Sequence, residues 1–124
     1  MTFEQDEINA AALETYGRII RAWKLSQREA AGLADMSDSM WQRAKAPDFT
    51  GTLTHDQLLR LSAIVGIYAA LEQYFSDPLA KTWFTRPNTG PLFHGERPID
   101  VAIAGGLPQI LTIRNYVDAL NCGA

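Results

Sequence analysis

Apolar side chains recur along this chain about every 3.6 residues, and this helical periodicity constrains the fold more than any other feature. The alternating apolar and polar runs of β-branched residues that are typical of strands are missing. We therefore predict an all-α protein, whose 124 residues, 47% of them apolar, can bury the core of one compact domain or of two small lobes. A first helix is expected from about Glu4 to Lys24, with an apolar face formed by Ile8, Ala12, Tyr16, Ile19, Ile20 and Trp23.

Capping patterns predict where the next helices begin. In Ser26–Glu29 and in Thr54–Gln57, the first hydroxyl and the last carboxylate or amide can satisfy each other's backbone amides at a helix start. These patterns predict a short helix from about Gln27 to Ala34 and, after Thr54, a long helix of about 20 residues with an apolar stripe.

A further short helix is expected between these two, over residues 39–45, because Ser37 or Asp38 can cap its first turn. Proline and glycine then mark a loop before the long helix. We place the boundary between two structural units in this loop, which divides the chain into residues 1–50 and 51–124.

Prolines and glycines predict the helix boundaries in the C-terminal part. Asp77-Pro78 is expected to provide an N-cap followed by proline at the first helical position, which starts a short helix over residues 79–84. We expect two more helices, started by Pro98 and Pro108 and separated by a break at Gly105-Gly106. The segment before Pro98 is expected to be an extended loop.

The sequence contains no set of side chains that is typical of catalysis or metal binding. His55 and His94 lie far apart, with no cysteine or paired carboxylate at the spacing of metal ligands. The serines are explained as helix caps, and Gly105-Gly106 lacks the residues that complete a phosphate-binding loop. Cys122 has no nearby histidine to activate it. We therefore expect neither an enzyme nor a cofactor nor a bound metal.

Composition favours a cytoplasmic protein without a membrane anchor. The chain has no apolar run of about 18 residues, its start is acidic, and its single cysteine cannot form an internal disulfide. The net charge of −3 argues against nucleic-acid binding, but residues 15–47 carry six basic and only three acidic side chains. This local excess is modest and permits contact with phosphates.

The segment Leu25–Ser37 is similar to the L-S-Q-x-E-A-A-x-L-x-x-[VM]-S pattern of Xre-type DNA-binding domains. Two short capped helices joined by a tight turn are the geometry of a helix-turn-helix, whose second helix enters the major groove. The alternative is a helical hairpin whose charges merely face solvent. The candidate DNA contacts are the polar side chains of Gln27, Arg28, Ser37, Ser39, Gln42, Arg43 and Lys45.

The C-terminal part resembles the toxin-binding domain of Xre/MbcA/ParS-type antitoxins, the partners of RES-domain toxins. Over roughly residues 54–123 it contains the motifs of that family in order: Trp83 with Pro87-Asn88, Gly95 with Pro98-Ile99-Asp100, Gly105-Gly106, and a closing helix that ends at Leu120. The resemblance implies an antitoxin that covers the NAD-binding cleft of a RES toxin, an NAD-consuming or ADP-ribosylating protein. It also implies a homodimer that binds operator DNA and represses its own operon.

The closing helix is where we expect the toxin to bind. Leu107, Ile110, Leu111, Val117 and Leu120 are predicted to face the core, and Ile113 to lie on another face. The candidate toxin contacts are Arg114, Asn115, Tyr116, Asp118 and Asn121, chosen by position and chemistry, with a solvated helix face as the alternative. The aromatic cluster Tyr74, Phe75, Trp83, Phe84 and Phe93 is expected to be core.

Two other functions are compatible with the sequence. The chain could be a stand-alone helix-turn-helix transcription regulator without a toxin partner, which would use its C-terminal half for dimerisation or ligand sensing. It could also be an adaptor that does not bind DNA. A RES-domain reading frame directly beside this one would distinguish the antitoxin from both.

Overall fold

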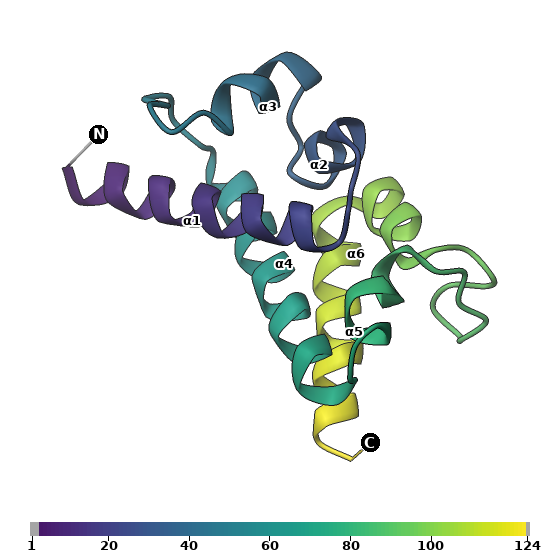
Figure 1. The fold of residues 1–124 in the computed structure, drawn as a ribbon. Coiled ribbons are helices and arrows are strands. Elements are labelled where there is room, and N and C mark those ends of the chain that lie inside the picture. The colour runs from purple at the N-terminus through teal and green to yellow at the C-terminus, as the bar shows by residue number, and fades with distance from the viewer. Residues whose placement is uncertain (1–2, 124) are drawn as a thin grey trace.

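Helices alone form the regular structure of residues 3–123, the part of the chain that this computed structural model describes (Figure 1). The prediction of an all-α fold is confirmed. The helices in chain order are α1 (Phe3–Ala22), α2 (Gln27–Leu33), α3 (Asp38–Ala44), α4 (His55–Tyr74), α5 (Leu79–Thr82), the 3₁₀-helix η1 (Trp83–Thr85) and α6 (Pro98–Asn121).

Hydrogen bonds confirm the predicted helix starts of α2, α3 and α4. The Glu29 backbone N–H donates to Ser26 Oγ at 3.0 Å, and the Ser26 N–H donates to Glu29 Oε1 at 2.9 Å. Thr54 and Gln57 make the same reciprocal pair at 3.0 and 2.9 Å. Ser37 caps α3, since its hydroxyl accepts from the backbone of the third residue after it. These bonds form between residues close in sequence, which is why the sequence predicts them.

The predicted N-cap at Asp77 is wrong. Pro78 is the residue before α5, and no side chain caps this helix. The Asp77 carboxylate instead lies 3.4 Å from Lys81 Nζ, so it compensates a positive charge rather than a backbone amide. Pro98, in contrast, is at the start of α6 as predicted.

The expected break in the C-terminal part is confirmed at Gly106. The helical path of α6 is interrupted there by φ 70° and ψ −158°, a backbone conformation that glycine adopts without steric cost. The helix restarts around Pro108, and the segment after the break packs along α4.

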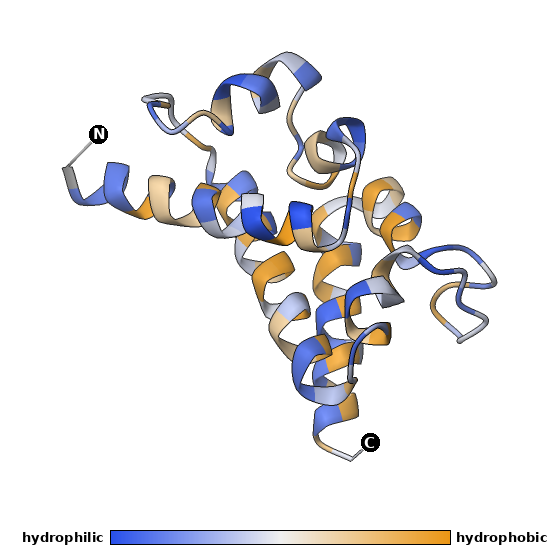
Figure 2. Cartoon of the chain, viewed as in Figure 1, coloured by the Kyte–Doolittle hydropathy of each residue, from blue (hydrophilic) through white to orange (hydrophobic). Residues whose placement is uncertain are grey.

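Helices α4 and α6 lie side by side and run in the same direction, as Figure 1 shows. Arg60 lies beside Gly106 and Gly66 lies beside Arg114. Near the C-terminal ends, Asn121 Nδ2 donates to the Ala70 carbonyl at 3.1 Å. Both helices contain many apolar residues, coloured orange in Figure 2. The centre of the core lies between them, where these apolar side chains are fully buried: Leu61, Ile64, Ile67 and Leu71 from α4, and Ile110, Ile113 and Val117 from α6.

Helix α1 crosses α4 and joins the N-terminal helices to the rest of the molecule. Trp23, just after α1, stacks on Phe84 with ring centroids 4.6 Å apart. Arg97 Nη2 lies 3.1 Å from Glu29 Oε2, so the start of α6 is also paired with the start of α2. The division into residues 1–50 and 51–124 follows the loop between α3 and α4 and stays a prediction, while these contacts join its two parts.

The predicted burial of four side chains is wrong. Ile8 is 49% exposed, because the buried stripe of α1 runs through Asn9 and Leu13 instead. On α6, Ile113 is fully buried and Leu111 is 41% exposed, because Ile110, Ile113 and Val117 are the stripe that faces α4. In the aromatic cluster, Trp83, Phe84 and Phe93 are buried and Phe75 is half-buried, but Tyr74 is 48% exposed.

Among the described helices, none combines the length and the apolar character that crossing a membrane requires.

Candidate functional site

One face of α6 points away from the core and carries Leu111, Arg114, Asn115 and Asp118. These residues are spaced three and four apart, so they lie in one row along the helix. The side chains of Arg114 and Asp118 are 39% and 53% exposed. The structure therefore brings together three of the five predicted toxin contacts, with Leu111 beside them.

The Arg114 guanidinium lies directly against α4, at Gly66. A Cβ atom at Gly66 would lie only 2.5 Å from both Nε and Cζ of Arg114. The space that this arginine fills therefore exists because residue 66 has no side chain. On its other side, Arg114 Nε lies 3.8 Å from Asp118 Oδ2. Held between α4 and a carboxylate, the guanidinium has fewer conformations to lose when a partner binds.

Tyr116 and Asn121 lie elsewhere on α6. The Tyr116 ring packs on Trp83 and Phe93, with centroid distances of 6.4 and 5.7 Å, and is half-buried in this aromatic cluster. The amide of Asn121 bonds the Ala70 carbonyl of α4. Both side chains thus hold α6 to its neighbours, and whether a partner also contacts them stays a prediction.

Sequence reasoning missed three residues of this surface: Leu59, Gly66 and Leu111. Leu59 is 40% exposed and lies seven residues before Gly66, which places it on the same face of α4. We call the surface formed by Leu59, Gly66, Leu111, Arg114, Asn115 and Asp118 the α4–α6 face. A mixture of exposed leucines and charged groups is typical of surfaces that bind other proteins. Only the spacing of the exposed residues on α6 could have been found in the sequence.

The second candidate surface consists of the exposed sides of α2 and α3. Gln27 Oε1 accepts from Lys45 Nζ at 2.8 Å and from Gln42 Nε2 at 3.3 Å, so these three side chains lie together. Arg43 Nη1 donates to Ser39 Oγ at 2.9 Å. Five of the seven predicted DNA contacts therefore form two hydrogen-bonded groups on α2 and α3.

The other two predicted DNA contacts have different surroundings. The Ser37 hydroxyl is engaged as the cap of α3, whereas Arg28 is an exposed cation on α2. Helix α3 is anchored by Trp41, which is 2% exposed and meets the Tyr16 ring edge-on at 5.5 Å. This anchor leaves Ser39, Gln42 and Arg43 on the outer side of α3.

Comparisons with known proteins show which family and which relative this chain resembles. Residues 70–123 match the family model of the antitoxin Xre/MbcA/ParS C-terminal toxin-binding domain. The chain is also 34% identical over 118 residues to the uncharacterized protein y4oB of Sinorhizobium fredii, in an alignment that covers 91% of this chain and 86% of that relative. The chain belongs to the same family as this rhizobial protein, and its residues 70–123 are an antitoxin toxin-binding domain of the Xre/MbcA/ParS type. No solved structure matches it.

The toxin-binding domain of this antitoxin begins within α4 and includes all of α6. It therefore contains Leu111, Arg114, Asn115 and Asp118, whereas Leu59 and Gly66 lie on the part of α4 before the matched residues. The alignment with the rhizobial relative covers 91% of the chain, so it extends beyond the toxin-binding domain into the N-terminal helices of this protein.

Proposed function

We propose that this antitoxin neutralises a RES-domain toxin by placing its α4–α6 face over the toxin's NAD-binding cleft. The observation that carries the proposal is the position of Arg114, which is half-exposed on the toxin-binding domain and held in place by Gly66 and Asp118. A pre-positioned arginine beside exposed leucines is the kind of side chain that contributes most to binding energy at protein interfaces.

The net charge of the chain is compatible with binding over such a cleft. A cleft that binds the pyrophosphate of NAD needs positive charge, which would attract a chain of net charge −3 and Asp118 in particular, while Arg114 would pair with an acidic group beside the cleft. The antitoxin acts by occupying space and removes no substrate, so neutralisation requires one antitoxin chain for each active site that is covered. No catalytic role is assigned to any residue of the chain.

A second proposed role is repression of the antitoxin's own operon in the cytoplasm, by a homodimer that places α3 in the major groove. Arg28 and Arg43 would contact phosphates, and Gln42 would reach base edges. The geometry that supports this role is the Trp41 anchor, which holds one side of α3 in the core and leaves its polar side outward. The runner-up functions are a stand-alone regulator and an adaptor that does not bind DNA.

Growth rescue with matched variants tests toxin binding. Leu111→Asp places a charge in the centre of the α4–α6 face, and Ile8→Asp makes the same kind of change at an exposed apolar residue of α1. We expect the Leu111→Asp antitoxin not to rescue the growth of cells that express the neighbouring RES toxin. In these cells the toxin should again consume NAD, and the variant should not co-purify with the toxin. Ile8→Asp should keep all three activities.

Other outcomes decide against the proposal. If both variants rescue growth, the α4–α6 face is not where the toxin binds. If the gene has no RES-domain neighbour and the wild type neutralises no RES toxin but binds its own promoter, the protein is a stand-alone regulator. If it binds neither, the adaptor is the better interpretation.

A further inference from the structure

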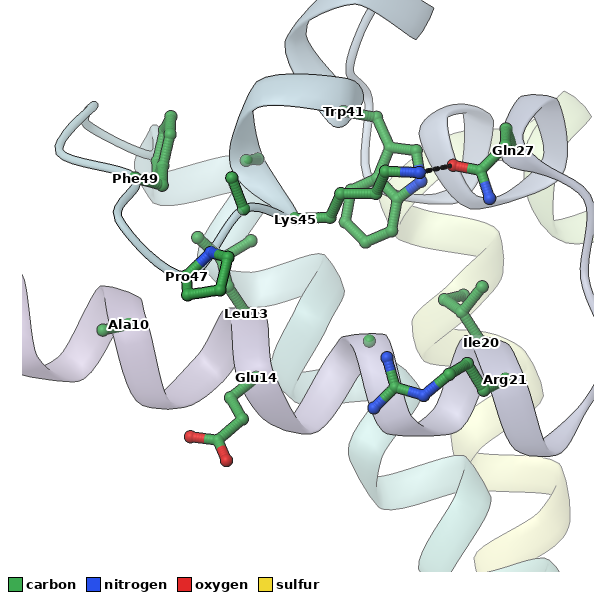
Figure 3. A pocket seen from close by; sticks show the side chains of 13 residues that line it. Ala10, Leu13, Glu14, Ile20, Arg21, Gln27, Trp41, Lys45, Pro47 and Phe49 are labelled. Carbon is green, nitrogen blue, oxygen red and sulfur yellow. Dashed lines mark hydrogen bonds between the residues drawn. The ribbon is translucent and has the colours of Figure 1, made fainter.

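A cavity of about 580 Å³ separates α1 from α3 (Figure 3). Its apolar walls include Leu13 and Ile20 from α1, Trp41 from α3, and Phe49 from the loop after α3. The volume falls within the range of about 300–1,000 Å³ that is usual for small-molecule sites. None of the residues that line the cavity belongs to the α4–α6 face, and only Gln27 and Lys45 are shared with the second candidate surface.

Gly17, in the middle of α1, lines this cavity and is not required by packing. A Cβ atom at this position would meet only Arg21 Nη1, at the ordinary contact distance of 3.6 Å. Glycine within a helix destabilises it relative to alanine, because glycine loses more backbone entropy on folding. Glycine at this position leaves room at the wall of the cavity that a larger side chain would occupy.

Trp41 contributes a polar group that is not satisfied. Its indole Nε1 is buried and has no hydrogen-bond partner among the described residues, although buried donors are nearly always paired. Lys45 follows one turn later on α3, and its Nζ is bonded to Gln27 Oε1 at 2.8 Å. Both Trp41 and Lys45 line the cavity.

The charges at the cavity favour an anion. Arg21 on α1 and Lys45 on α3 approach it from opposite walls, as Figure 3 shows. Arg21 forms no salt bridge with any residue between positions 3 and 123. The Glu14 carboxylate, which also lines the cavity, is compensated by Arg18 at 2.7 Å. The uncompensated charge at this site is therefore positive.

We propose that this cavity binds a small organic acid with an apolar, preferably aromatic, body. The body packs against Leu13, Ile20 and Trp41, and the acid group lies between Arg21 and Lys45. The indole N–H of Trp41 donates a hydrogen bond to the acid group when Lys45 turns toward the ligand. Such a ligand contacts α1 and α3 together and holds α3 at a fixed distance from the rest of the fold.

Titration with anilinonaphthalene sulfonate, an aromatic acid that fluoresces when it leaves water, tests this site on the full chain. The readout is the set of indole N–H cross-peaks in a nitrogen–proton NMR spectrum, one from each of the three tryptophans, assigned with Trp41→Phe. We expect the Trp41 cross-peak to shift with saturation at one ligand per chain, and the Trp83 cross-peak to stay in place. A shift at Trp83 alone, or at neither, would overturn the proposal.

Matched variants locate the bound acid. Gly17→Phe fills the cavity and should abolish the shift, whereas Ala11→Phe adds the same ring to an exposed position of α1 and should preserve it. Arg21→Gln should raise the dissociation constant by about three- to tenfold, and Arg28→Gln, which removes a cation outside the cavity, should leave it unchanged. Because Arg21 is exposed, its variant should fold even if Gly17→Phe does not. Equal affinity of Arg21→Gln and the wild type would place the acid elsewhere and refute this site.

Discussion

Replacement of Gly66 by alanine should make the antitoxin more stable and at the same time a weaker binder. The added Cβ would lie 2.5 Å from Arg114 Nε and Cζ, so the guanidinium must leave its place on α4. The displaced group is the end of a flexible, partly exposed side chain, so the cost to folding is small. Alanine also favours the helix over glycine by about 0.5–1 kcal/mol. We expect the midpoint of thermal unfolding to rise by about 2–5 °C.

The expected loss of toxin binding follows from the role proposed for Arg114. Truncation of an arginine that anchors an interface typically costs about 1–2 kcal/mol or more, which is roughly a five- to thirtyfold increase in Kd. Gly66→Ala keeps the arginine but removes its fixed position, so the increase in Kd should be smaller than that of Arg114→Ala. Calorimetry with the purified toxin gives both dissociation constants, and thermal melts give the stabilities.

Combination of the two substitutions separates a displaced arginine from other causes. If Gly66→Ala acts through Arg114, it should not weaken binding further in a chain that already carries Arg114→Ala. Gly17→Ala is the matched control, because it makes the same change in α1 with only an ordinary contact to Arg21 at 3.6 Å. It should raise stability to a similar extent and leave the toxin affinity unchanged. An equal loss of binding with and without Arg114 would refute the reasoning, as would a destabilised Gly66→Ala.

Three other predictions concern the remaining parts of the fold. Trp83→Ala should lower the free energy of unfolding by about 3–5 kcal/mol, because the indole is buried against Phe93; a thermal melt like that of the wild type would contradict this. Arg28→Gln and Arg43→Gln should each weaken binding to the promoter and reduce the dependence of log affinity on log salt by about one, as gel-shift titrations at several salt concentrations would show. Ser26→Ala should lower the free energy of unfolding, measured by urea denaturation, by about 1 kcal/mol, because the cap of α2 is lost. An unchanged urea midpoint would mean that this cap contributes little to stability.

The parts of the fold that could be predicted are those that depend on neighbours in sequence. The cap at Ser26 requires only Glu29, and the kink at Gly106 requires only a residue that tolerates a positive φ. The sequence does not predict which side of α1 is buried near its start, because both Ile8 and Leu13 lie on plausible apolar stripes. The packing of other helices decides between them. Asp77 has the sequence of a cap, but a lysine on the next turn is its partner.

The candidate site shows the same limit. The four-residue spacing of Arg114 and Asp118 places them on one side of a helix, and in the structure their side chains lie together. Nothing in the sequence relates Arg114 to Gly66, because that contact depends on α4 and α6 lying side by side. The side on which Leu111 lies could not be predicted either, since it depends on how α6 continues after its break.

The common direction of α4 and α6 has an electrostatic consequence at one end of the molecule. Peptide dipoles add along a helix, so each carboxyl end carries about half of a negative elementary charge on its last carbonyls. Because α4 and α6 end near each other, at Tyr74 and Asn121, these partial charges add instead of cancelling. Neither helix has a basic residue in its last turn to offset them. A basic partner that approaches this end therefore meets a field set by the backbone itself.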